Sequence, residues 1–258
     1  MSLIINADDF GKSENVNKAI TECFNRGYIN RTTIMVNMPF AEEASEIAEK
    51  NGFTAKVGLH INLTEGRPLT DKIAGIRDFC DENGCFNAAF YHSTIKRLYM
   101  SEEYVRAITE EIKAQLDKYA ELGFSLNHID SHHHVHTNYP VLKALRVLSK
   151  SYDFSSIRLS RNLYKGGSSL NRLYKNIYNR EIKRICSEVT DYFGSFNDAL
   201  DYFSASGEDK ACVDATEQFK RFISENALEI MVHPMYSESG VLVDTDIPFE
   251  KENLLYEI

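Results

Sequence analysis

Short apolar segments alternate with longer amphipathic segments along most of this chain. Six short segments are predicted to be strands, at 3–5, 32–36, 56–63, 126–129, 156–159 and 228–232. Six longer segments are predicted to be helices, at 14–26, 41–51, 101–122, 140–150, 169–189 and 216–225. Strands that alternate with helices of about ten residues or more indicate βα units and a parallel sheet. The alternation therefore predicts an α/β fold with mostly parallel strands.

The chain length and the residues after the first strand favour a barrel over an open sheet. The sequence has 258 residues, and α/β barrels commonly run to ~200–250 residues as one domain. No glycine-rich dinucleotide turn follows the first predicted strand, which disfavours a Rossmann fold. We expect one domain over residues 1–258, folded as a closed or nearly closed barrel. Residues 64–100 show little periodicity and are predicted to form a long loop excursion, of a kind that often covers an active site.

The charge balance of the chain argues against two classes of binding partner. Lys and Arg number 29 and Asp and Glu number 38, so the formal net charge is −9. This acidic balance argues against a general binder of nucleic acids or anionic membranes. Segment 158–184 departs from it, with eight Lys or Arg against one acidic residue and with Tyr164, Tyr174 and Tyr178 between them. We interpret it as a solvated helix face; the alternatives are a nucleic-acid patch or tyrosines that stack on sugar rings.

The cysteines and the amino-terminal residues indicate a cytoplasmic protein. Five scattered cysteines do not form a disulfide framework and are expected to be free thiols in a reducing compartment. A local disulfide or metal knuckle between Cys80 and Cys85 is the alternative. Residues 1–5 lack the basic region of a signal peptide. No apolar run approaches the ~18 residues of a membrane span, so we expect no membrane association.

Polar side chains gather at the ends of the predicted strands. In parallel α/β folds, catalytic groups come from the carboxyl ends of several strands, which meet at one face of the barrel. Residues far apart in the sequence are therefore expected to converge there. The candidates at or near these strand ends are Asp8, Asp9, His60, Asp130, His132, Arg158 and His233.

Five of the eight histidines lie between residues 128 and 136. If this segment is extended, alternate residues from 128 to 136 share one face. These residues are His128, Asp130, His132, His134 and His136. Imidazole is the commonest protein ligand of catalytic metal ions, so the cluster predicts a metal site. The alternative is a polar loop whose histidines are satisfied by hydrogen bonds.

Two imidazoles and one carboxylate would hold a catalytic metal and leave a position open for water. His60 and one histidine of 132–136 supply the nitrogens, and Asp8 or Asp9 supplies the oxygen. Neighbouring residues at a strand end point in opposite directions, so one aspartate can bind the metal while the other acts as a base. A turn or a helix cap is the alternative role for the pair.

Three further residues have candidate roles around such a metal. His233 could lie across the metal from the aspartates as a general acid, although a lone histidine there is more often structural. Arg158 could orient a carboxylate, and a surface salt bridge is its alternative. Asp130, two residues before His132, could accept an imidazole N–H and orient that ring.

At this point the ordered motifs resemble those of the YdjC-like carbohydrate deacetylases, which include the chitooligosaccharide deacetylases. The motifs are Asn6-Ala7-Asp8-Asp9-Phe10-Gly11, Gly58-Leu59-His60-Ile61-Asn62-Leu63-Thr64 with Gly66 and Pro68, Asp130-Ser131-His132-His133-His134-Val135-His136, and Val232-His233-Pro234. They run from residue 6 to residue 234. The resemblance implies a distorted (β/α) barrel of the glycoside hydrolase/deacetylase type, with mostly parallel strands.

The resemblance also implies an activity and residue roles. The activity is metal-dependent hydrolysis of N-acetyl groups on amino sugars, with small chitooligosaccharides such as diacetylchitobiose as substrates. The metal ligands carried over by motif are Asp9, His60 and His132, with Asp8 as general base and His233 as general acid. Residues expected to support the site or contact substrate are Asp130, His134, His136, Arg158 and Arg67.

Two departures from the family pattern put the substrate fit in question. Met235 follows His233-Pro234 where the family commonly has glycine. Segment 158–162 lacks the acidic residue that is often found near its end. Both departures leave the expected metal ligands unchanged.

Other functions remain open from the sequence. A metallo-phosphoesterase or amidohydrolase on a similar barrel would hold two metals about 3.5–4 Å apart. An iron oxygenase shares the ligand types, and a sugar- or metal-binding protein without activity is a third alternative. One divalent ion is expected, with zinc favoured by the nitrogen ligands and magnesium or another divalent ion as alternatives. An acetylated amino sugar is the expected partner, and a homodimer is compatible with the sequence.

Overall fold

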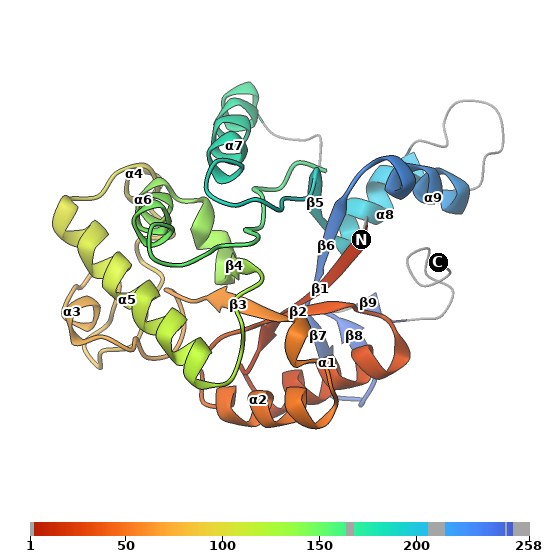
Figure 1. Cartoon of the computed structure of the whole chain (residues 1–258), viewed down its shortest axis with the longest axis horizontal. Helices are drawn as coiled ribbons and strands as arrows, with labels where there is room; N and C mark the ends of the chain where they lie inside the picture. The colour runs from red at the N-terminus through yellow and green to blue at the C-terminus, as the bar shows by residue number, and fades with distance from the viewer. Residues whose placement is uncertain (1–2, 164–167, 206–214, 246, 250–258) are drawn as a thin grey trace.

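The computed structural model describes residues 3–163, 168–205, 215–245 and 247–249, and its centre is a curled six-stranded parallel sheet (Figure 1). The strand order is β4-β3-β2-β1-β6-β5, and every neighbouring pair is parallel. The strands are β1 (Leu3–Phe10), β2 (Arg31–Ile34), β3 (Val57–Ile61), β4 (Ile129–Ser131), β5 (Tyr192–Ser195) and β6 (Leu228–Val232). The predicted α/β barrel with mostly parallel strands is confirmed as a curled half-barrel sheet of this kind.

Helices follow the strands as the βα pattern requires. They are α1 (Glu14–Arg26), α2 (Ala41–Lys50), α3 (Asp71–Ala74), α4 (Thr94–Leu98), α5 (Glu102–Glu121), α6 (Tyr139–Leu148), α7 (Ser169–Ile182), α8 (Phe196–Ala205) and α9 (Ala215–Glu225). Helix α1 shows why the sequence signals were informative. The Ser13 side chain accepts a hydrogen bond from Val16 N at its start, and Gly27 adopts φ 74° at its end. None of the helices in the described part of the chain has the length and apolar character that a membrane span needs.

An irregular segment lies between β4 and β5, the two edges of the half-barrel sheet. The strand predicted at 156–159 forms only isolated bridges, from Ile157 to Ile129 and from Ser156 to Glu188, so that prediction is wrong in its extent. Further along, Leu163 N donates to Phe193 O on β5 at 3.1 Å. The segment therefore connects the two edge strands without a regular ladder.

Other elements differ from the prediction in position. The helix expected over 169–189 ends at Ile182, and β5 with α8 follows it. The excursion at 64–100 contains the short helices α3 and α4. A second, antiparallel sheet of β7 (Pro234–Tyr236), β8 (Leu242–Asp244) and β9 (Ile247–Pro248) was not predicted.

The thiols follow the main expectation in the described residues. The free cysteines are Cys23, Cys80, Cys85 and Cys186. A disulfide between Cys80 and Cys85 is therefore wrong, and Cys212 lies outside the described residues. Burial raises the pKa of the Cys23 thiol to about 12, so this group stays protonated at neutral pH.

The segment after β4 is not extended. A 3₁₀ helix covers His132–Thr137, and His133 and His134 have left-handed backbones with φ of 51° and 55°. The predicted common face of five alternating residues is therefore wrong, because the chain turns directly after β4.

Candidate metal centre and active site

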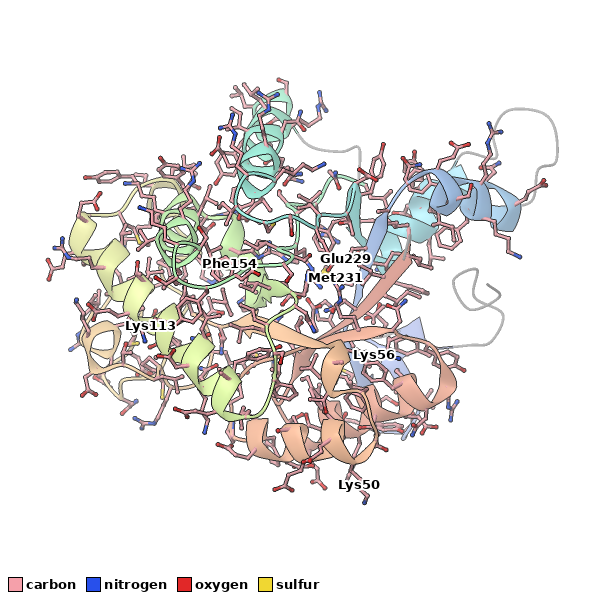
Figure 2. All side chains as sticks on the ribbon, viewed as in Figure 1. Lys50, Lys56, Lys113, Phe154, Glu229 and Met231 are labelled. Atoms are coloured by element: carbon pink, nitrogen blue, oxygen red, sulfur yellow. The ribbon has the colours of Figure 1, made fainter. Side chains whose placement is uncertain are left out.

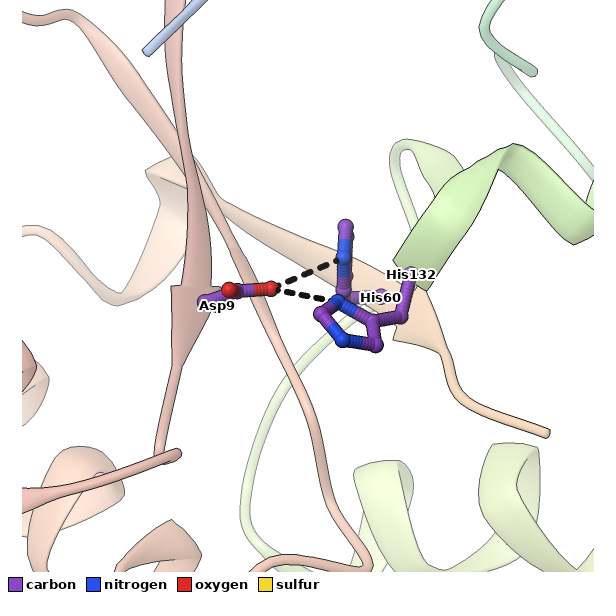
Figure 3. A group of neighbouring side chains, drawn as sticks. All are labelled: Asp9, His60 and His132. Atoms are coloured by element: carbon purple, nitrogen blue, oxygen red, sulfur yellow. Dashed lines mark hydrogen bonds and ion pairs between the residues drawn. The ribbon is translucent and has the colours of Figure 1, made fainter. Parts of the chain in front are cut away.

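Asp9, His60 and His132 converge at the carboxyl ends of β1 and β3 and the start of the 3₁₀ helix (Figure 3). Asp9 Oδ1 lies 2.9 Å from His132 Nδ1 and 3.2 Å from His60 Nε2. One ligand atom from each residue lies within 4.8 Å of the other two. Three side chains from distant parts of the sequence thus present two nitrogens and one oxygen to the same space.

A bulge in β1 allows both aspartates to face the interior. The pairing register between β1 and β2 shifts between Ala7 and Phe10, and Asp9 has φ 71°. This left-handed backbone breaks the strict alternation of side chains along a strand. Asp8 and Asp9 are both buried, with Asp8 directed to Arg158 and Asp9 to the histidines.

A carboxylate stands behind the ring of His60. His60 Nδ1 lies 2.7 Å from Asp130 Oδ1 and 3.1 Å from Thr33 Oγ1. With Nδ1–H directed at this carboxylate, Nε2 is the ring nitrogen that faces Asp9, as in metal sites where a carboxylate orients a ligating histidine. Burial disfavours a charged ring, but the carboxylates of Asp130 and Asp9 raise the pKa of His60 to about 10. The same negative charge favours a bound cation.

His132 has an equivalent partner that the sequence analysis missed. His132 Nε2 lies 3.0 Å from Glu65 Oε2, which in turn lies 2.8 Å from Lys12 Nζ. The contact with His132 lowers the pKa of the Glu65 carboxyl to about 2. Glu65 stands between Thr64 and Gly66 of a motif already singled out, so its position was a usable signal.

Asp8 lies beside this group and is held by Arg158. Arg158 Nη1 donates to Asp8 Oδ2 at 2.7 Å and Nη2 donates to Oδ1 at 2.8 Å. Asn6 Nδ2 also donates to Oδ1, at 2.8 Å. Burial opposes ionisation, but the guanidinium charge keeps the pKa of Asp8 well below its usual range. Asp8 is therefore a carboxylate at neutral pH.

A pocket of about 350 Å³ opens onto both aspartates. Its lining residues are Asp8, Asp9, Lys12, Ser13, Val16, Glu65, His233, Pro234 and Met235. His233 Nε2 lies 3.9 Å from Asp8 Oδ2, and the His233 side chain is 40% exposed. The His233 backbone N–H donates to Asp244 Oδ1 at 2.7 Å, which fixes the start of the second sheet beside the pocket.

The ligand chemistry fits a divalent metal. Two imidazole nitrogens and one carboxylate oxygen suit zinc, cobalt or iron better than magnesium. The buried residues Asp9, His60 and His132 supply this set next to an open pocket. A metal between Asp8, His60 and Asp130, which also lie close together, is disfavoured because Arg158 Nη2 lies 2.8 Å from Asp130 Oδ2 and already occupies the space between Asp130 and Asp8.

Comparison with known proteins assigns the family. The family model described as YdjC-like protein matches residues 2–253. The chain belongs to the YdjC-like family. A protein from Halalkalibacterium halodurans named carbohydrate deacetylase is 30% identical over 236 residues, which are 92% of this chain and 86% of that protein. A carbohydrate deacetylase from Vibrio parahaemolyticus is 28% identical over 257 residues, which are 98% of this chain and 85% of its own length.

A solved structure supports the same fold for this YdjC-like chain. The crystal structure is of a protein from Enterococcus faecalis described as a candidate for cellobiose-phosphate cleavage. It is 27% identical, with a TM-score of 0.64. The similarity covers 92% of this chain and 82% of that one.

Three expected support residues lie outside the proposed ligand group of this YdjC-like chain. His136 Nδ1 is 2.6 Å from Ser131 Oγ, and burial lowers the pKa of His136 to about 4. Burial also lowers the pKa of His134, whose ring makes a T-shaped contact with that of Phe193. Arg67 lines a separate cavity of about 470 Å³. Because burial lowers their pKa values, His134 and His136 are neutral rings at neutral pH.

The two departures from the family pattern have distinct surroundings. Met235 is 38% exposed and lines the pocket beside His233. Asn162 at the end of the closing segment accepts from Phe193 N at 2.7 Å and donates to Asp191 O at 2.8 Å. An ionised carboxylate could not make the second bond, so asparagine suits this contact with the start of β5.

The basic segment is divided between interior and surface. Arg158 is fully buried, whereas Leu170, Leu173 and Ile177 of α7 are exposed. Tyr174 and Tyr178 donate to backbone oxygens of Thr137 and His136. Tyr164 lies outside the described residues. Tyr174 and Tyr178 therefore anchor α7 to the 3₁₀ helix, a role that stacking on sugars does not explain.

Proposed function

We propose that this protein is a metal-dependent carbohydrate deacetylase that removes N-acetyl groups from amino sugars. The observation that carries the proposal is the convergence of Asp9, His60 and His132 beside a pocket that Asp8 and His233 also line. The names of the relatives point to the same class of reaction. Small chitooligosaccharides such as diacetylchitobiose are the proposed substrates.

Asp9, His60 and His132 are the proposed holders of one divalent ion, with zinc favoured. Such an ion supplies positive charge that polarises a carbonyl and lowers the pKa of a bound water. Asp130 and Glu65 orient the two histidine rings from behind. Their negative charge also strengthens the rings as ligands.

Asp8 and His233 are the proposed proton carriers. Within the described residues, Oδ2 of Asp8 accepts a hydrogen bond from Arg158 Nη1, which leaves an acceptor position on this oxygen. Asp8 takes a proton from the water that attacks the acetamide carbonyl. His233 gives a proton to the nitrogen as the C–N bond breaks, so the products are acetate and a free amine. A positioned acid or base of this kind typically contributes about 10²–10⁴ in rate.

The proposal is tested by acetate release from diacetylchitobiose and from monomeric N-acetylglucosamine. Protein stripped with a chelator is expected to be inactive, and one equivalent of zinc is expected to restore acetate release. Release that is unaffected by complete removal of the metal would exclude the metal-dependent mechanism. A requirement for two metals per chain would instead favour the phosphoesterase or amidohydrolase alternative.

A further inference from the structure

Arg158 is fully buried, and each nitrogen of its guanidinium group has a carboxylate partner. Nη1 and Nη2 hold the two oxygens of Asp8, and Nη2 also contacts Asp130. Nε donates to Glu229 Oε1 at 2.6 Å. Glu229 belongs to β6 in the interior (Figure 2) and is 1% exposed. Glu229, which binds Nε of this guanidinium, has no role in the mechanism proposed above.

Glu229 acts at a distance from the pocket. Its register partners are Ile4 on β1 and Phe193 on β5. Because Ile4 precedes Asp8 by four residues along β1, Glu229 lies nearer than Asp8 to the amino ends of the strands. It is absent from the residues that line the pocket and from the proposed ligand group. Its other charged neighbour is His128, whose Nε2 lies 3.5 Å from Glu229 Oε1, and its hydrogen bond toward Asp8 runs through Arg158.

Two neighbours fix the guanidinium in complementary ways. The Arg158 guanidinium carbon lies 4.8 Å from the centroid of the Phe193 ring, which supports the face of the group. A ring face resists tilting but leaves rotation within the guanidinium plane free. The hydrogen bond from Nε to Glu229 prevents that rotation. Together the two contacts direct both Nη groups at Asp8.

Stability alone is a weak explanation for a carboxylate at this position. Burial would raise the pKa of Glu229, but the Arg158 charge holds it below its usual range, so Glu229 is ionised in the interior. Replacing a buried ion pair by apolar residues of similar volume is often neutral or stabilising. A strand as apolar as Leu228–Val232 would bury a methionine or leucine here more readily than a charge.

We infer that Glu229 is a positioning residue for the proposed reaction, which holds Arg158 so that its fork keeps Asp8 aligned with the pocket. The inference rests on the proposed function, in which Asp8 accepts the proton. Loss of the Glu229 contact leaves Arg158 held in its plane only by Asp8 and Asp130 on the Nη side, so the guanidinium can turn and the two-point contact with Asp8 is distorted. A misplacement of about 1 Å at a reacting group can cost about 10²-fold in rate.

The test compares two substitutions of similar size in the metal-loaded protein. Glu229→Met fills the space without an acceptor, and we expect kcat to fall about 100-fold while KM and metal content stay unchanged. Glu229→Gln keeps an acceptor oxygen for Nε and is expected to retain kcat within about tenfold. Glu181→Gln is the control, because it breaks an arginine–glutamate pair with Arg146 on the outer helices, and its kcat should stay within about twofold.

A double-mutant cycle separates positioning from a general role in folding. Arg158→Lys cannot form the fork, so Asp8 is already misaligned in that protein. Glu229→Met is then expected to lower kcat by less than about threefold further, because neighbouring groups that act as one unit are not additive. Full, independent losses in the double variant would overturn the inference, and so would wild-type kcat in Glu229→Met.

A crystal structure of Glu229→Met tests the geometry without an activity assay. We expect the Arg158 guanidinium to be rotated away from the two-point contact with Asp8. An unchanged contact would overturn the inference whether or not the protein is a deacetylase. Failure of the wild-type protein to release acetate would instead remove the proposed function and leave this structural result standing. If Glu229→Met does not fold, Arg158→Lys is assayed in its place, and wild-type kcat in this variant would overturn the inference, because lysine cannot form the fork that keeps Asp8 aligned.

Discussion

The two halves of the site are built on opposite principles. On one side, Asp9 Oδ1 faces nitrogens of both His60 and His132, and the pocket reaches this carboxylate. On the other side, Arg158 is fully buried and each of its nitrogens has a carboxylate partner. The first half can exchange its internal contacts for a cation, whereas the second half is complete within the protein. The proposed metal binding and the proposed proton transfer therefore belong to separate, adjacent groups.

The most direct way to break this comparison is to remove one residue from each half. His60→Ala is expected to lose both the metal and acetate release. Asp8→Asn keeps the size of the side chain and leaves the ligand group intact, so we expect normal metal content and a rate lower by about 10²–10⁴. Elemental analysis and acetate release on the same samples measure both effects. Normal deacetylation by Asp8→Asn would remove Asp8 from the base role.

A smaller change sharpens the description of the metal half. Glu65→Gln removes the negative charge behind His132 and is expected to weaken metal binding by about tenfold, within the range seen for residues that orient metal ligands. Excess zinc should restore acetate release in this variant. Competition with a chromogenic chelator measures the affinity, with the exposed Glu110→Gln as control. Equal affinities in the two variants would show that Glu65 does not support His132.

The smallest expected effect concerns acid stability in the Arg158 half. The pKa of Glu229 is lower in the folded protein than its unfolded value of about 4.3, so its ionised form stabilises the fold above that pH. This contribution is lost as the pH falls below about 4.3. Urea unfolding of metal-free protein from pH 6 to pH 3 should show a shallower acid decline for Glu229→Gln. Parallel pH curves for this variant and the wild type would contradict the expectation.

Much of the fold could be predicted because burial imposes an apolar pattern on each strand and each helix separately. The alternation of apolar strands with capped helices predicted the parallel sheet, because each βα unit carries its own signal. The segment at 156–159 has strand composition, but Arg158 turns into the interior and the backbone pairs only briefly with β4. Strand β5 was missed because Ser195 leads directly into α8 with no loop between them.

The candidate site was predictable where residues stand at strand ends. His60 and the aspartates gather as expected, because parallel strands end at one face. The arrangement of the histidines after β4 was not predictable by alternation, since His133 and His134 adopt left-handed backbones. Glu229 carried a signal that was overlooked, namely a charged residue inside a fully buried apolar strand.

The left-handed backbone at Asp9 has a consequence for how this position can vary. Aspartate, asparagine and glycine tolerate such a conformation far better than longer or branched residues. Asp9 thus provides both the bend in β1 and the carboxylate that lies at the bend. Asp9→Asn removes the charge and keeps the left-handed backbone accessible. Asp9→Glu keeps the charge but makes this backbone conformation less favourable. Attempts to retune the ligand set by directed evolution will therefore meet a backbone constraint before they meet a chemical one.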